Sequence, residues 1–142
     1  MAVKPLLAIT LSVALLISAG ITLAGSEEIC ATWINTEYHK GIHHRKLQKT
    51  IFTPDGTLRE YRDESSPSPD WEGTYTITEK WTDSEENIWY KIKVTEPLHG
   101  GLLYFLSRIS DSGKTLELVC HPFDYHKELD PKHPSYRIYY RK

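Results

Sequence analysis

Two charged side chains of opposite sign stand within apolar alternating patterns. Glu79 interrupts one aromatic series and Arg108 interrupts another. The apolar members of these series are Tyr75, Ile77, Trp81, Leu102, Tyr104 and Leu106. Because a buried charge is costly unless it is paired, Glu79 and Arg108 either pair with each other or orient the polar group of a ligand in an aromatic-lined cavity. The alternative places both at the rim of the fold, in contact with solvent.

Histidines form a second group of residues able to do chemistry. They gather in two segments that also carry carboxylates, and imidazole and carboxylate ligands suit zinc. The histidines of these segments are His39, His43, His44, His121, His126 and His133. Their spacing matches no compact metal-binding motif, and polar loops of this composition are ordinarily solvated. We therefore expect no metal ion and no other cofactor.

Catalytic motifs are absent from the sequence. It contains no Gly-X-Ser-X-Gly, no His-Glu-X-X-His and no recognisable cysteine–histidine pair, so neither an enzymatic activity nor catalytic residues are expected. The 17 basic side chains are balanced by 19 acidic ones, which gives a formal net charge of −2. This dispersed charge provides no electrostatic footprint for nucleic acid, and no nucleic-acid partner is expected.

The amino-terminal segment is typical of a secretory signal peptide. Lys4 precedes an apolar run from Leu6 to Ile17, and small residues follow up to Gly25. This order predicts a signal peptide over residues 1–24, cleaved after Ala24. The alternative is an uncleaved anchor, because a span needs about 20 apolar residues. Cleavage predicts an exported protein, periplasmic or secreted, with no stable membrane insertion and a single domain over residues 25–142.

Cys30 and Cys120 are the only cysteines in the chain. In an exported protein, two thiols are more often joined as a disulfide than left as separate groups. We therefore predict a Cys30–Cys120 bridge that ties the first strand to a late one.

Alternation of apolar and polar residues with a period of two predicts strands from Ile29 onward. The expected strands are Ile29–Asn35, Leu47–Phe52, Thr57–Arg62, Gly73–Trp81, Ile88–Val94, Leu102–Ser110, Thr115–Cys120 and Tyr136–Arg141. Tight turns such as Pro54-Asp55-Gly56 favour successive hairpins. A meander of this kind avoids exposed edges by closing into an eight-stranded antiparallel up-and-down barrel, and a β-sandwich is the alternative.

Short motifs on the first and last strands add a family resemblance. Ala31-Thr32-Trp33 is similar to the Gly-X-Trp pattern with which the calycins (lipocalins, fatty-acid-binding proteins and avidins) open their barrel, and Asn35 extends it as in avidins. In lipocalins a late arginine packs across this tryptophan, which implies Arg137 or Arg141. Fatty-acid-binding proteins grip a carboxylate with Arg-X-Tyr, and Arg137-Ile138-Tyr139 has that spacing. The layout most resembles small bacterial exported lipocalin-like domains.

The expected function is non-enzymatic binding of a small, largely apolar ligand inside the barrel. The residues expected to line its site are Tyr75, Ile77, Trp81, Tyr90, Tyr104, Arg108 and Arg137, and one of the two arginines would meet a polar group of the ligand. The alternative is a protein-interaction or inhibitor module whose barrel is filled by its own side chains. Its contacts would come from the His121–Pro134 loop or the Tyr38–Lys46 segment, since loops on a rigid scaffold carry recognition.

Overall fold

A computed structural model describes residues 27–35, 47–96 and 98–142. The strands are β1 (Thr32–Ile34), β2 (Lys49–Phe52), β3 (Thr57–Tyr61), β4 (Trp71–Thr82), β5 (Ile88–Thr95), β6 (Leu102–Ser110), β7 (Thr115–His121) and β8 (Arg137–Arg141), with a short 3-10 helix η2 (Asp111–Gly113). Each expected strand is present, several with shifted bounds. The predicted signal peptide and the Tyr38–Lys46 segment lie outside the described residues.

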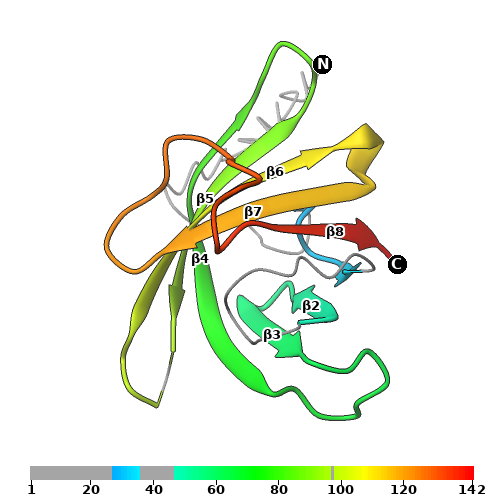
Figure 1. Ribbon diagram of the computed structural model, residues 1–142, viewed down its shortest axis with the longest axis vertical. Helices are drawn as coiled ribbons and strands as arrows, with labels where there is room; N and C mark the ends of the chain where they lie inside the picture. The colour runs from blue at the N-terminus through cyan, green and yellow to red at the C-terminus, as the bar shows by residue number, and fades with distance from the viewer. Residues whose placement is uncertain (1–26, 36–46, 97) are drawn as a thin grey trace, which may run out of the picture.

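The strands form a closed barrel in which each strand pairs with the next one along the chain (Figure 1). All pairs are antiparallel, and β8 returns to pair with β1 through Ile34 and Tyr140. This confirms the predicted all-β, up-and-down barrel rather than the sandwich, and the fold is consistent with a lipocalin-like architecture. No helix in the described part of the chain is long and apolar enough to cross a bilayer.

The two ends of the barrel differ in their connections. At one end, called here the turn end, strands are joined by the short turns 53–56, 83–87 and 111–114. At the other, called the loop end, the described connections are the longer segments 62–70 and 122–136 and the residues that join β5 to β6. In Figure 1 the β4–β5 turn is at the top and the orange β7–β8 connection is at the left.

The chain before β1 closes the turn end. Ile29 and Trp33 are fully buried, and the Trp33 Nε1 donates a hydrogen bond to the carbonyl of Ile29 at 2.9 Å. The guanidinium of Arg141 packs over the Trp33 ring at 5.0 Å from its centroid, and its Nε donates to the carbonyl of Gly113. Arg141, one of the two predicted arginines, thus covers the first-strand tryptophan.

A β-bulge divides β4 into two parts that face opposite ways. Ile77 pairs with Ile92, but Glu79 pairs with Lys91, so Thr78 is an extra residue in the strand. Such an insertion reverses the alternation of side chains beyond it. Tyr75 and Ile77 accordingly pack in the interior, as predicted, whereas Trp81 lies on the outer face.

The predicted Cys30–Cys120 disulfide is wrong. Neither cysteine forms a disulfide, and the two residues are not at the distance that a disulfide requires. Cys30 precedes β1 at the turn end, where its Sγ lies 3.3 Å from the Tyr75 Oη, while Cys120 is near the end of β7 at the loop end. Because β1 and β7 both run from the turn end to the loop end, these two positions lie at opposite ends of the barrel.

Candidate functional site

The residues predicted to line a ligand site are divided between the interior and the outer face of the barrel. Tyr75, Ile77 and Tyr90 belong to the interior core, and Arg137 also faces inward because it pairs with the buried Leu118. The other three, Trp81, Tyr104 and Arg108, lie on the outer face. On β6 the interior residues are Leu103, Phe105 and Ile109 and the buried Ser107, so the alternation is opposite to that assumed for Tyr104 and Arg108.

Glu79 and Arg108 do not pair with each other. Lys91 Nζ lies 2.9 Å from the Glu79 carboxylate, and Arg108 donates two hydrogen bonds to Glu117, one of them at 2.5 Å. Both pairs join neighbouring strands on the outer face. The two charges that interrupt apolar patterns are therefore part of the barrel's outer surface.

A polar cluster occupies the inner wall toward the loop end. Thr50, Glu60, Arg137 and Tyr139 come from β2, β3 and β8, and Thr50 pairs directly with both the buried Trp33 and Glu60. Arg137 donates a hydrogen bond to the Glu60 carboxylate at 3.0 Å. Their side chains are 25% and 12% exposed, so solvent reaches the ion pair although it lies on the inner face. This pair is the main departure from apolar character among the inner residues described above.

Electrostatics hold the cluster in one charge state. Burial opposes the charge of Arg137, but the neighbouring Tyr139 and Glu60 outweigh burial and raise its pKa above the ordinary value. Burial raises the pKa of Tyr139, with Arg137 acting in the opposite direction. The pKa of the nearby Cys120 thiol is also raised by burial. Near neutral pH the cluster therefore presents a guanidinium, a neutral phenol and a neutral thiol.

Two hydroxyls of the cluster have unused hydrogen-bonding capacity. Among the described residues, neither the Thr50 Oγ1 nor the Tyr139 Oη makes a hydrogen bond of normal geometry, although both residues are fully buried and Tyr139 lies close enough to Thr50 and Arg137 to interact with them. A buried polar group left unsatisfied costs about 1–3 kcal/mol, and such groups are rare enough in native proteins to need an explanation. A ligand with a polar group is one such explanation.

Comparison with protein families, curated proteins and solved structures finds no match to this chain. The site must therefore be interpreted from its own geometry.

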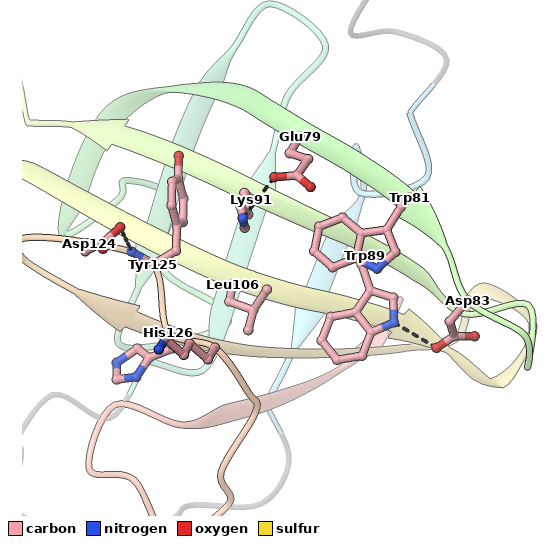
Figure 2. Close-up of a pocket in the computed structure, with 10 residues that line it drawn as sticks. Glu79, Trp81, Asp83, Trp89, Lys91, Leu106, Asp124, Tyr125 and His126 are labelled. Atoms are coloured by element: carbon pink, nitrogen blue, oxygen red, sulfur yellow. Dashed lines mark hydrogen bonds and ion pairs between the residues drawn. The ribbon is translucent and has the colours of Figure 1, made fainter.

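A groove lies on the outer face of β4, β5 and β6. It has a volume of about 650 Å³ and lies between this wall and the β7–β8 connection (Figure 2). The wall contributes Glu79, Trp81, Asp83, Trp89, Lys91 and Leu106, and the connection contributes residues 124–127. Tyr125 fixes the connection to the wall, because its Oη lies 2.5 Å from the Thr78 Oγ1 and its ring packs edge-on against Tyr104.

The histidines of the β7–β8 connection are packed together. The ring centroids of His121 and His126 are 5.3 Å apart, and those of His126 and His133 are 4.4 Å apart. Their ring nitrogens interact with local groups: His133 Nδ1 accepts a hydrogen bond from the Ser135 amide, and His126 Nε2 lies 3.2 Å from the Cys120 carbonyl. Within the described ranges, no set of three His, Cys, Asp or Glu residues is arranged to hold a metal ion. The other histidine group lies outside them.

Sequence reasoning found only Arg137 of the inner polar cluster. A signal for Glu60 was present, because it shares one face of β3 with the buried Leu58 and so interrupts an apolar pattern as Glu79 does. Tyr139 was recognised only as part of the Arg-X-Tyr motif. Thr50 gave no signal, since threonine is common on both faces of a strand.

Proposed function

We propose that this protein binds a small, largely apolar molecule inside the barrel, with a neutral polar group of the ligand at Thr50 and Tyr139. The observation that carries the proposal is the pair of fully buried hydroxyls beside the Arg137–Glu60 ion pair that, among the described residues, make no hydrogen bond of normal geometry. A hydroxyl, carbonyl or amide of a ligand would complete their hydrogen bonds and recover the cost of burying them. The interior side chains that form the core of the barrel are aromatic and aliphatic, a composition that suits contact with the apolar body of such a molecule.

Charge balance argues for a neutral polar group rather than a carboxylate. The resemblance of Arg137-Ile138-Tyr139 to fatty-acid-binding proteins implies a carboxylate ligand. Here, however, Glu60 already neutralises the Arg137 guanidinium at 3.0 Å. Adding a second carboxylate would leave an uncompensated negative charge at a site that solvent reaches only in part, which is unfavourable. The ligand class is therefore that of apolar alcohols, ketones or amides.

The test uses a fluorescent apolar probe and two competitors that share one hydrocarbon chain. N-phenyl-1-naphthylamine is titrated into the protein and then displaced with dodecanol or dodecanoate. We expect dodecanol to displace the probe at lower concentration than dodecanoate. The combined Thr50→Val and Tyr139→Phe variant should weaken dodecanol binding about tenfold, the effect of losing one or two net hydrogen bonds. Preferential binding of dodecanoate, or no binding of probe and competitors, would overturn the proposal.

Matched controls separate loss of the site from loss of the fold. Tyr140→Phe changes the neighbouring tyrosine of β8 on the outer face, and Thr76→Val changes an exposed threonine of β4. Neither should alter dodecanol binding. An equal loss in these controls would show that the effect is not due to the inner hydroxyls.

A protein-interaction role is the second candidate, supported by one observation. Phe123, within the predicted recognition loop, is 82% exposed on the β7–β8 connection. An exposed aromatic side chain on a loop is the kind of residue that anchors an interface when a partner provides a pocket for it. Capture experiments with the native protein should lose such a partner when Phe123 is changed to Ser, while binding of dodecanol is unaffected.

A further inference from the structure

We propose that the groove between the β4–β6 wall and the β7–β8 connection binds a neutral oligosaccharide. This site is independent of the proposed interior ligand, because it lies on the opposite face of the wall (Figure 2). Its volume of about 650 Å³ falls within the range of small-molecule sites, roughly 300–1,000 Å³.

A stacked pair of tryptophan rings, called here the platform, forms one end of the groove. The indole rings of Trp81 and Trp89 are nearly parallel, with an interplanar angle of 7° and centroids 5.7 Å apart. Both residues are only partly buried and line the groove (Figure 2). The apolar C–H face of a sugar ring stacks on such a surface, and aromatic rings offer this contact area with few rotatable bonds.

Neighbouring groups hold this platform in place before any ligand arrives. The Trp89 Nε1 donates a hydrogen bond to the Asp83 Oδ2 at 2.8 Å, and the Arg108 guanidinium lies 5.3 Å from the Trp89 ring centroid. The hydrogen bond from Trp89 is also the main reason why the pKa of Asp83 is lowered. A rigid platform reduces the entropy lost on binding, so weak stacking contacts can give measurable affinity.

Polar groups surround the platform in a mixture that suits hydroxyls. The groove presents the carboxylates of Glu79, Asp83 and Asp124 together with the ammonium groups of Lys91 and Lys127. Each sugar hydroxyl can donate to a carboxylate and accept from an ammonium group. Because carboxylates and ammonium groups nearly balance, the groove offers no excess positive charge for an anionic ligand.

An added peptide strand is a poorer match to the middle of this wall. β5 pairs with β4 over Ile88–Thr95 and with β6 over the same residues, so both of its edges are occupied. Recognition by strand addition needs an unpaired edge. The groove therefore offers side chains rather than main-chain groups, as a sugar site requires.

The test measures intrinsic tryptophan fluorescence while maltotriose, cellotriose or triacetylchitotriose is added to the full protein. We expect at least one of these neutral sugars to bind with a millimolar or tighter dissociation constant. Trp81→Ala should weaken that binding about tenfold through loss of one stacking contact. Glu79→Gln, which keeps the shape of an exposed side chain, should weaken it severalfold. The anionic trigalacturonate should bind more weakly than the neutral sugars.

Controls distinguish this proposal from the proposed interior site. Lys93→Ala on β5 and Tyr139→Phe in the interior should leave sugar binding unchanged, and Trp81→Ala should leave dodecanol binding unchanged. Absence of binding by all three neutral sugars would overturn the proposal. So would unchanged affinity in both Trp81→Ala and Glu79→Gln, or preference for trigalacturonate. Binding of a proline-rich peptide that depends on Trp81, without sugar binding, would reassign the groove to a protein partner.

Discussion

The hydroxyls of Thr50 and Tyr139 set this interior apart from a core packed only for stability. Because neither makes a hydrogen bond of normal geometry among the described residues, removing the Tyr139 hydroxyl removes a desolvation cost. Tyr139→Phe is expected to raise the free energy of unfolding by about 1 kcal/mol in the absence of ligand. Urea denaturation measures this, with Tyr140→Phe as the control. A clear loss of stability would mean that the hydroxyl has a structural partner.

Glycine is required at position 73 because the Trp71 side chain occupies the space that a Cβ would need. A Cβ at this position would lie 2.4 Å from the Trp71 ring and 2.8 Å from the carbonyl oxygen of Thr95. Gly73→Ala should therefore destabilise the barrel by about 1–3 kcal/mol, the usual cost of overpacking. Gly101→Ala is the matched control, since a Cβ there meets nothing within 4 Å. Equal denaturation midpoints for both variants would contradict this explanation.

Acid should destabilise the folded protein through carboxylates with lowered pKa values. The pKa of Glu28 is lowered mainly by a backbone hydrogen bond and also by Lys80, and that of Asp83 mainly by the hydrogen bond from Trp89. Their ordinary values are 4.5 and 3.8. The stabilising contribution is present above these values and is lost as the pH falls through the lower folded-state values. The melting temperature should therefore fall between neutral pH and about pH 3. Asp83→Asn should show a smaller fall.

At the scale of the element, the β-bulge in β4 determines which charged side chain points into the turn end of the barrel. Beyond Thr78 the inward position is Lys80, whose Nζ lies 2.7 Å from the Glu27 carboxylate, and the same oxygen accepts a hydrogen bond from the Tyr90 Oη at 3.0 Å. Without the bulge, Glu79 would take the inward position and meet Glu27 as a like charge. The extra residue therefore makes closure of this end electrostatically favourable.

Removing Lys80 should test that closure. Lys80→Met leaves the Glu27 carboxylate, which is 4% exposed, without its ion-pair partner. Since Lys80 itself is 39% exposed, we expect a loss of about 1–2 kcal/mol rather than the full cost of breaking a buried pair. Lys91→Met is the control, because its partner Glu79 is 55% exposed and such pairs contribute less than about 1 kcal/mol. A larger loss in the control would contradict the role of the bulge.

The strands and turns were predictable because period-two alternation and turn residues are local signals. The direction in which each face points was less so. In β4 the bulge reverses the alternation after Thr78, and no glycine or proline around Thr78 marks an insertion. The charge of Glu79 within an aromatic series was the one trace of this reversal, but the sequence alone favoured a position at the rim of the barrel, with a pair to Arg108 or a ligand contact as the alternatives.

β6 was misassigned for a different reason. Its inner face carries Leu103, Phe105 and Ile109, while its outer face carries Tyr104 and Leu106, so both faces are apolar. Leu106 is buried on the outside beside Val119 and Tyr136, which the β7–β8 connection helps to cover. Alternation cannot distinguish the inside from the outside of a strand that is covered on both faces. The outer groove could therefore not be predicted from the alternation of apolar and polar residues.

At the scale of the whole molecule, β1 and β7 run in the same direction, and this keeps the two cysteines too far apart to form a disulfide. Because Cys30 and Cys120 lie at opposite ends of the barrel, we expect no disulfide between them in the folded protein. The denatured mass should correspond to two thiols, and the melting temperature should be the same with and without a reducing agent. A mass lower by two hydrogens, with a melting temperature that falls on reduction, would contradict this arrangement.

The barrel wall formed by β4, β5 and β6 has recognition chemistry proposed on both sides. Tyr90 and Ile92 face the interior, and Trp89 and Lys91, which alternate with them along β5, face the groove. Because the wall is a single β-sheet, the two surfaces are the two faces of the same strands. The same rigid strand pairing therefore positions both sets of side chains.

The stacked Trp81–Trp89 pair also gives the molecule an optical signature. Two indole rings held in nearly parallel planes at 5.7 Å couple through their π–π* transitions, and where the two transition dipoles are skewed within those planes the coupling produces an exciton couplet in the far-ultraviolet circular dichroism spectrum. The couplet depends on the β4–β5 register on the far side of the bulge, where Trp81 is directly opposite Trp89. Its disappearance would therefore report opening of this hairpin before the rest of the barrel unfolds.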